Sequence, residues 1–513
     1  LTLVYFIFIH TKIMFTFYIF FTLCAYVLAG PRVPESEWTD LDRYVFTNDP
    51  EYSYFKQTEY RTATITTHII RMTSQRWMTD TFSSQSLWWH HLAIVIPDQL
   101  NFPDAAILTI EMGDQTDDLP TPENNDLLFY SGEYAAAVGV VAVLLRQNPN
   151  QPITFPADDR QLSRFEDEII AWTWRKYMLD GGRNGTARTS SILQFPMTKA
   201  AKAALDTVQD FCYTNNQLNI TRFMVTGASK RGWATYLIAA LDDRVVAMAP
   251  QVFTVLNFRA NIKHHYRSLG GYSWAFGDYW RENLTSEVDS PLTDEIMALI
   301  DPYAYRSRYN GMPKLIINAA GDEFFLNDDS HYFWNDLPEP KYYWMIENTN
   351  HALIGAIEEV YENLQAFYKI VLNGWNFPEF TWTRETTTDG ARITVTARSL
   401  TPTLTSWEAD TSDDIRRDFR LLRLPINGGD TPEANDVLWI EDAGNVDDLG
   451  GGRWSADVDY SELTGNLWRA FFIQATFTID DGDDLSLSTE CHHIPDVFPF
   501  PPCSGAQCYG KLV

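Results

Sequence analysis

Short apolar runs alternate with segments of helical periodicity along most of the chain, and this alternation constrains the fold more than any other feature. Apolar runs at 62–72, 92–97, 106–113, 138–145, 222–227, 245–253, 314–320 and 341–347 predict strands. Segments at 165–179, 199–215, about 229–240 and 354–372 predict helices. Strands that alternate with helices indicate a mostly parallel, doubly wound sheet of the α/β class, covered on both faces. The polar residues 31–60 predict an extended lead-in to this sheet.

The pattern changes after about Asn376. A long alternating run from Trp382 to Ala397 predicts a strand, and clusters of Gly, Asp and Asn separate further short strands near 403–409, 418–424, 436–440 and 467–479. No long helical pattern follows. These features are typical of a small antiparallel β-sandwich, so we predict domains at 30–375 and 376–513.

Residues 1–29 are almost wholly apolar, and Lys12 is their only charged residue. Val27 and Ala29 fit the −3 and −1 positions of a signal-peptidase site, which predicts cleavage before Gly30, secretion, and no membrane span afterwards. A start at Met14 would lack the usual basic n-region. The alternative is a retained anchor, since the stretch is long enough to cross a bilayer. Cleavage is favoured because the run ends without a basic flank.

Cysteine usage and short acceptor patterns agree with an exported protein. Cys503 and Cys508 enclose a short loop, so we predict that they pair; elimination then pairs Cys212 with Cys491. Cleavage before Gly30 would remove Cys24, and the four cysteines that remain allow three connectivities; a zinc site is the competing interpretation. Sequons predict glycosylation at Asn184, Asn219 and Asn283.

The overall charge and composition exclude two classes of protein. A formal net charge of −29 repels phosphate backbones, which makes nucleic acid an improbable partner. A hydrophobic content of 45% and an aromatic content of 14% exclude a mainly disordered chain. The composition itself indicates only a folded, acidic protein.

The segment RFMVTGASKRGWATYL contains a candidate nucleophile. A predicted strand ends just before Gly227-Ala228-Ser229, and a predicted helix follows at once. A serine on a sharp strand-to-helix turn needs small neighbours, and Gly227, Ala228 and Gly232 supply them. The usual pattern is G-x-S-x-G, whereas here the second glycine comes one residue later. The alternative interpretation is a serine that only caps the helix.

Two further residues follow strands in the order expected of a serine triad. Asp322 lies just past the run 314–320, and His351 lies just past 341–347. Carboxyl ends of parallel strands share one edge of the sheet, so both side chains should meet Ser229 there. We expect Ser229 to attack a carbonyl, His351 to take its proton and Asp322 to orient the imidazole. Glu323 is the rival acid. The alternatives are an aspartate that caps a turn and a loop histidine without a catalytic role.

An oxyanion hole needs two backbone N–H groups. The first is expected from Lys230, after the nucleophile, and the second from the loop that contains Gly113. The side chains of Lys230 and Arg231 could offer positive charge to a substrate, or simply lie on a helix surface. Residues 256–312 form a long aromatic insertion, which we expect to form one wall of a pocket over the nucleophile. The alternative is a helical excursion that packs on the edge of the sheet. No spacing indicates a metal site or another cofactor.

Several long stretches resemble the PhoPQ-activated pathogenicity-related protein family, which includes secreted autocrine proliferation repressor proteins. They include SQRW, LLRQNPNQPITF, FPMTKAAKAALDTVQDF, VTGASKRGWATYL, INAAGDEFF and RRDFRLL, and together they span most of 60–425. The resemblance implies an α/β-hydrolase fold with a C-terminal β-rich domain, and Ser229, Asp322 and His351 as the triad. The GASKRG segment is also similar to that of glucuronoyl esterases, where a basic residue follows the nucleophile.

Two functions follow as hypotheses. The first is a secreted serine hydrolase that cleaves an ester or amide of a small molecule or peptide. The second is an extracellular signalling protein that uses the hydrolase fold as a binding scaffold, with a cell-surface receptor as its partner. Loss of biological activity in a folded Ser229→Ala variant would separate the two.

Overall fold

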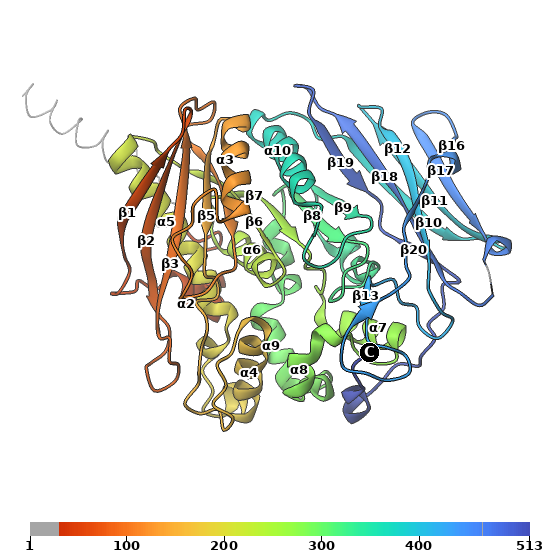
Figure 1. Ribbon diagram of the computed structural model, residues 1–513, viewed down its shortest axis with the longest axis horizontal. Coiled ribbons are helices and arrows are strands. Elements are labelled where there is room, and N and C mark those ends of the chain that lie inside the picture. The colour runs from red at the N-terminus through yellow and green to blue at the C-terminus, as the bar shows by residue number, and fades with distance from the viewer. Residues whose placement is uncertain (1–29, 464) are drawn as a thin grey trace, which may run out of the picture.

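The computed structural model describes residues 30–463 and 465–513. The predicted signal peptide at 1–29 therefore lies outside the described residues. Figure 1 shows a large twisted sheet flanked by helices, with further antiparallel sheets beside it. Among the described residues, no helix combines the length and the apolar character needed to cross a membrane.

The large sheet has nine strands in the order β1-β2-β3-β5-β4-β6-β7-β8-β9. The pairs β1–β2, β2–β3 and β3–β5 are antiparallel, and every later pair in this order, from β5–β4 to β8–β9, is parallel. The strands are β1 (Ser53–Arg61), β2 (Ile65–Arg76), β3 (Leu87–Pro97), β4 (Ala105–Ile110), β5 (Val141–Leu145), β6 (Arg222–Ala228), β7 (Val245–Gln251), β8 (Lys314–Ala319) and β9 (Lys341–Ile346). This order, with crossover helices between parallel strands, is the α/β-hydrolase arrangement and confirms the predicted fold class.

Helices cover both faces of the sheet, because the parallel strands are apolar on both sides. On one face, α3 (Asp126–Val138) and α10 (Ile357–Asn373) share a buried core with the strands. The other core includes α4 (Glu166–Leu179), α5 (Gln194–Asn216) and α6 (Lys230–Leu241). Helix α10 ends at Gly374, whose φ of 67° suits a residue without a side chain.

The segment between β7 and β8 is largely helical. It contains α7 (Phe258–Leu269), α8 (Gly277–Arg281) and α9 (Pro291–Ile300), joined by 3-10 turns. These short helices lie at the lower edge of the molecule in Figure 1, below the carboxyl ends of the parallel strands. They correspond to the aromatic insertion expected at 256–312.

The C-terminal region is antiparallel. One sheet has the order β10-β11-β17-β16, and the other has β15-β12-β18-β19 with β20 also on β18. Apolar residues of β11, β17, β18 and β20 form a shared core, as in a sandwich. The strands are β10 (Glu379–Thr386), β11 (Gly390–Arg398), β12 (Thr403–Asp410), β15 (Ile440–Asp442), β16 (Val446–Asp448), β17 (Arg453–Asp459), β18 (Arg469–Thr478), β19 (Asp484–Ser488) and β20 (His492–Ile494), with a separate pair β13 (Leu422–Arg423) and β14 (Glu433–Ala434).

Five local expectations are wrong. The strands expected near 418–424 and 436–440 reduce to β13 and to Ile440, the first residue of β15. The lead-in at 31–60 contains a capped helix, α2 (Asp40–Phe46), and the edge strand β1. The run Trp382–Ala397 belongs to a hairpin, because β10 and β11 pair across a turn at residues 387–389. The predicted strand at 138–145 begins late, since residue 138 is the last of α3 and β5 starts at Val141.

One of the two predicted disulfides is absent from the described residues. Cys503 and Cys508 are bonded. Cys212 and Cys491 are free and buried, so pairing by elimination was wrong. Cys212 belongs to the core side of α5, and burial raises the pKa of its thiol to about 12. Cys491 instead contacts His493 in the C-terminal region. Each thiol therefore acts as a small buried side chain.

Candidate active site

Ser229 lies on the turn between β6 and α6. Its backbone has φ 59° and ψ −127°, a strained conformation for a residue with a side chain, and its N–H donates to Gln251 O at 2.9 Å. The neighbouring glycines make this turn possible. A Cβ at Gly227 would lie 2.9 Å from Arg231 O, and one at Gly232 would lie 2.9 Å from Gln251 O. The shifted second glycine thus serves the packing of α6 on β7.

The structure brings Ser229, His351 and Asp322 together. His351 Nε2 lies 2.9 Å from Ser229 Oγ, and His351 Nδ1 lies 2.9 Å from both carboxylate oxygens of Asp322. The Asp322 side chain is fully buried, whereas the His351 ring is 16% exposed. Serine, imidazole and carboxylate therefore form one continuous hydrogen-bonded chain, with the geometry that serine hydrolases use.

Backbone donors hold the acid and the base in place. Asp322 Oδ1 accepts the N–H groups of Phe324 and Phe325 at 2.7 and 3.0 Å. Glu323 accepts the N–H of His351 at 3.0 Å through its own carboxylate. The rival acid therefore anchors the histidine backbone and leaves the ring to Asp322. Burial raises the pKa of Glu323 and outweighs the hydrogen bond from His351 N–H, which lowers it.

The C-terminal region forms hydrogen bonds with the loop that carries Asp322 and with the loop that carries His351. Leu421 N donates to Gly321 O at 3.0 Å, next to the acid. Asn348, three residues before the base, exchanges two hydrogen bonds of 2.9 Å with the backbone of Trp439. Leu421 belongs to the RRDFRLL segment, so one part of that segment supports the loop that carries Asp322.

The side chains of Lys230 and Arg231 do not lie on a helix surface. Lys230 Nζ is 2.8 Å from Glu166 Oε2 and 2.9 Å from Asp167 Oδ2. Arg231 pairs with the other oxygen of Glu166 and donates to Asn148 O at 2.8 Å. Both cations are buried. Burial alone would lower the pKa of Lys230, but the charges of Asp167 and Glu166 outweigh it and raise that pKa.

Sequence reasoning missed Glu166 and Asp167 as parts of this site. Acidic residues at a helix start are common because they suit the helix dipole, and no further signal distinguished these two. In the structure, Glu166 and Asp167 neutralise Lys230 and Arg231, the two cations that directly follow the nucleophile. Glu166 also exchanges hydrogen bonds with Gln151, in the loop after β5.

The predicted oxyanion donors are placed differently with respect to the site. Lys230 is the first residue of α6, directly after Ser229. Its backbone N–H therefore belongs to the first helical turn, whose N–H groups have no partner within the helix. Gly113 lies past the end of β4 with φ 128°, and a Cβ there would lie 2.7 Å from Asp117 Oδ2. Gly113 does not line the cavity at Ser229. Its role as the second donor stays a prediction.

A cavity opens beside Ser229. Its lining is mostly aromatic and aliphatic, and residues of the insertion contribute much of it. Asp167 and Lys230 are the charged residues among those that line it, and they pair with each other. The lining comprises Asp167, Trp174, Ser229, Lys230, Trp233, Phe253, Val255, Phe258, Ile262, Tyr272, Phe276, Tyr279, Leu284, Thr285, Val288, Phe324 and Phe325.

A buried group outside the cavity has potential metal ligands. Ligand atoms of His264, Asp328 and Asp329 lie within 4.8 Å of one another. Asp328 is already engaged, because His264 Nε2 lies 2.6 Å from one oxygen and Arg417 Nη2 lies 2.7 Å from the other. These contacts make an internal ion pair that joins the insertion, the β8–β9 loop and the C-terminal region. We assign no metal or cofactor to it.

The three predicted sequons lie outside the long helices and strands, at different depths. Asn184 and Asn219 are exposed, and Asn283 is half-buried. Thr285, the hydroxyl residue of the third sequon, is buried and bonded to Tyr509 O. Glycosylation at these positions stays a prediction.

Comparisons with known proteins place the chain in a family. Autocrine proliferation repressor protein A of Dictyostelium discoideum is 31% identical over 486 residues, which cover 92% of this chain and 94% of that protein. Among solved structures, acetyl xylan esterase from Paenibacillus sp. R4 is 15% identical, covers 67% of this chain and 97% of that one, and has a TM-score of 0.42. Glucuronoyl esterase from Solibacter usitatus is 13% identical, with 63% and 86% coverage and a TM-score of 0.38.

The family assignment rests on the sequence matches, since the two structural likenesses are distant. The model described as PhoPQ-activated pathogenicity-related protein matches residues 41–420, which is most of the chain. This match confirms the predicted resemblance: the chain belongs to the PhoPQ-activated pathogenicity-related protein family.

Proposed function

We propose that the protein is a serine hydrolase that cleaves an ester or amide through an acyl-enzyme. The observation that carries this proposal is the chain of 2.9 Å contacts from Ser229 through His351 to Asp322 beside an apolar cavity. A serine held in a strained turn costs stability, and strain of this kind concentrates at functional sites. A serine that only caps a helix would need neither the strain nor the imidazole.

The chemistry follows from the geometry. His351 Nε2 accepts the proton of Ser229 as Oγ attacks the substrate carbonyl, and the resulting imidazolium donates it to the leaving group. Asp322, buried and bonded to Nδ1, fixes the ring tautomer and stabilises the imidazolium. The Lys230 N–H supplies one oxyanion donor, and water then attacks the acyl-enzyme by the reverse steps.

The cavity favours a substrate with an uncharged, bulky apolar group. Its two charged residues neutralise each other, and Asp167 also accepts the hydroxyl of Tyr279 at 2.7 Å. A charged substrate group would have to enter a mainly aromatic space without a free partner, which is unfavourable. Burial of an apolar group there is favourable in proportion to its area.

A fluorophosphonate probe tests the proposed hydrolase. We expect the folded protein to be labelled and the Ser229→Ala variant to be unlabelled. Ser286→Ala is the matched control, because Ser286 lies in the same insertion but does not line the cavity. Equal labelling of Ser229→Ala, or no labelling of the folded wild-type protein, would refute the proposal.

A second function is proposed from the name of the relative, which is an autocrine proliferation repressor. In this view the protein is secreted, with residues 1–29 removed, and restrains growth through a cell-surface receptor. Growth assays with folded Ser229→Ala protein discriminate the two mechanisms. Full activity of the variant would favour a binding scaffold, and loss of activity would make hydrolysis the mechanism. N-terminal sequencing of secreted protein would test cleavage before Gly30.

A further inference from the structure

We propose that the C-terminal segment 500–513, closed by the Cys503–Cys508 disulfide, braces the outer wall of the cavity at Ser229 and so determines which substrate groups fit. This inference rests on the proposed hydrolase function and adds a specificity-determining element to it. The segment lies far from Ser229 in sequence, yet it bonds directly to residues that line the cavity.

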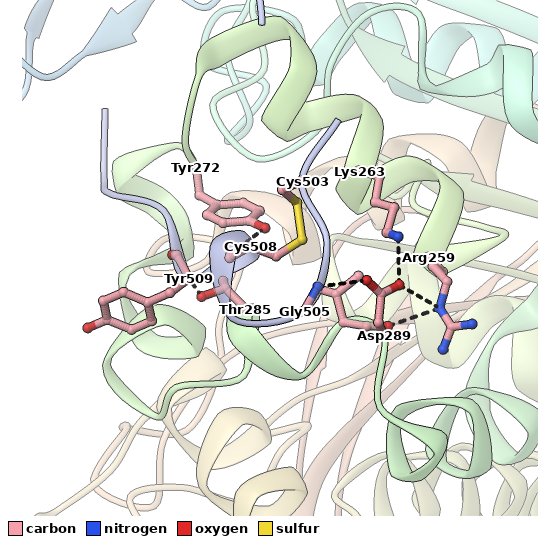
Figure 2. Close-up of a disulfide and its surroundings, with 10 residues drawn as sticks. Arg259, Lys263, Tyr272, Thr285, Asp289, Cys503, Gly505, Cys508 and Tyr509 are labelled. Carbon is pink, nitrogen blue, oxygen red and sulfur yellow. Dashed lines mark hydrogen bonds and ion pairs between the residues drawn. A yellow bond between two sulfur atoms is a disulfide. The ribbon is translucent and has the colours of Figure 1, made fainter. Parts of the chain in front are cut away.

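Two lining residues donate side-chain hydrogen bonds to the segment. Tyr272 donates from its hydroxyl to Cys508 O at 2.9 Å, and Thr285 donates to Tyr509 O at 3.1 Å. Figure 2 shows both side chains directed at the turn that the disulfide closes. Tyr272 is fully buried and Thr285 is 4% exposed. Water therefore cannot replace these partners without opening the wall.

Backbone bonds join the same stretch of the insertion to the segment. Tyr272 N donates to Lys511 O, and Val513 N donates back to Tyr272 O, both at 2.8 Å. The approach is close, because a Cβ at Gly271 would lie 2.3 Å from Lys511 O. Residues 511–513 thus join the wall through an isolated parallel β-bridge between Tyr272 and Leu512, and only glycine at 271 permits that distance.

A half-buried ion pair holds the other end of the turn. Gly505 N donates to Asp289 Oδ2 at 3.0 Å, and Asp289 Oδ1 pairs with Lys263 Nζ at 2.6 Å (Figure 2). Lys263 belongs to α7, which also carries the lining residues Phe258 and Ile262. The segment therefore bonds directly to Tyr272 and Thr285, and it reaches α7 through Asp289 and through the bond from Phe500 N to Arg267 O at 3.2 Å.

The disulfide gives this brace its shape. Residues 505–509 form a single 3-10 turn, and such a short turn has little stability of its own. The cross-link between Cys503 and Cys508 limits the conformations of the turn, so the carbonyls of Cys508 and Tyr509 stay directed at the wall. Loss of the cross-link should loosen the wall while the triad, which the segment does not touch in these contacts, keeps its own hydrogen bonds.

The test uses the full-length protein with Cys503→Ser/Cys508→Ser and Tyr272→Phe. Tyr303→Phe is the matched control, since the Tyr303 hydroxyl bonds Asp336 and its ring does not line the cavity. Fluorophosphonate labelling first establishes whether the wild-type site is active. We then compare kcat/KM for p-nitrophenyl esters with short and long acyl chains.

We expect the long-to-short ratio of kcat/KM to rise about fivefold in both test variants and to stay constant in the control, as for loss of one hydrogen bond of typical net strength. Hydrogen exchange is the readout that does not need activity. Residues 270–288 should exchange about fivefold faster in the test variants. Wild-type protein that the fluorophosphonate does not label would refute only the proposed hydrolase function. Unchanged hydrogen exchange of residues 270–288 in the test variants would refute the support of the cavity wall by segment 500–513, whether or not the protein is active. An unchanged ester ratio in active protein would refute the role in specificity.

Discussion

Glu166 is the residue whose loss should most disturb the surroundings of the nucleophile without touching the triad. It pairs with both Lys230 and Arg231, the two residues that follow Ser229. Glu166→Gln keeps the shape of the side chain and removes its charge. Lys230 would retain Asp167 at 2.9 Å, so Arg231 is the cation left without a carboxylate.

The size of the effect follows from burial. Arg231 is 5% exposed at its side chain and Glu166 is 28% exposed. Breaking a buried pair by removing one partner costs about 3 kcal/mol, at the low end of the usual range because Glu166 reaches solvent. Asp180→Asn is the control, since it breaks the partly exposed pair with Lys176 on the same helix. An i, i+4 pair of that kind contributes about 0.5 kcal/mol.

Urea unfolding monitored by tryptophan fluorescence measures both variants. A loss of about 3 kcal/mol shifts the midpoint by at most about 1 M, because m is large for a chain of this size, and the control should shift it far less. Equal losses in Glu166→Gln and Asp180→Asn would refute the reasoning that the cluster is a buried charge pair. The fluorophosphonate labelling rate should fall in Glu166→Gln and stay constant in the control.

The pH dependence gives an independent check. Burial alone would raise the pKa of Glu166, but Arg231 and Lys230 outweigh burial and lower it. A carboxyl with a depressed folded-state pKa stabilises the fold above its unfolded pKa of about 4.3, and this contribution is lost as pH falls toward the folded value. The difference between wild type and Glu166→Gln should therefore stay constant from about pH 8 to about pH 5 and shrink below about pH 4.

Three further predictions concern the triad, the nucleophile turn and the thiols. Asp322→Asn should lower kcat about 10⁴-fold with the hydrogen-bond geometry intact, whereas Glu323→Gln should have a smaller effect; steady-state ester hydrolysis measures both. Gly232→Ala should destabilise the protein by about 1–3 kcal/mol, because its Cβ would meet the Gln251 carbonyl at 2.9 Å; thermal unfolding checks this, and an unchanged midpoint would contradict it. Thiol titration of denatured, unreduced secreted protein should find two thiols, and a third would indicate that Cys24 was retained.

The sequence predicted those parts of the site that depend on strand ends. Ser229, Asp322 and His351 each follow an apolar run, and parallel strands bring their carboxyl ends to one edge of the sheet. The pairing of Glu166 with Lys230 and Arg231 could not be predicted, because it depends on where α4 packs against α6. The same holds for Trp439, which lies in the C-terminal region and bonds Asn348 in the loop before His351.

The misplaced elements have local causes. Strand β1 is an edge strand with exposed polar residues, so it lacks the apolar alternation that identifies inner strands. The β10–β11 turn interrupts an alternation that otherwise continues on both sides, and its threonines are typical of strands. Cys212 and Cys491 carry no sequence signal that distinguishes a buried thiol from half of a disulfide.

The support that residues 421, 439 and 508–513 give to the site has a consequence for biosynthesis. The chain leaves the ribosome from its N-terminus, so Ser229, Asp322 and His351 all emerge before these residues exist. The loops around the acid and the base lack their hydrogen bonds to Leu421 and Trp439 at that stage, and the cavity lacks its outer support. Nascent chains that end between His351 and Leu421 should therefore have low activity, activity should rise once residues 421 and 439 have emerged and paired, and the final substrate preference should appear only when Cys503 and Cys508 are oxidised.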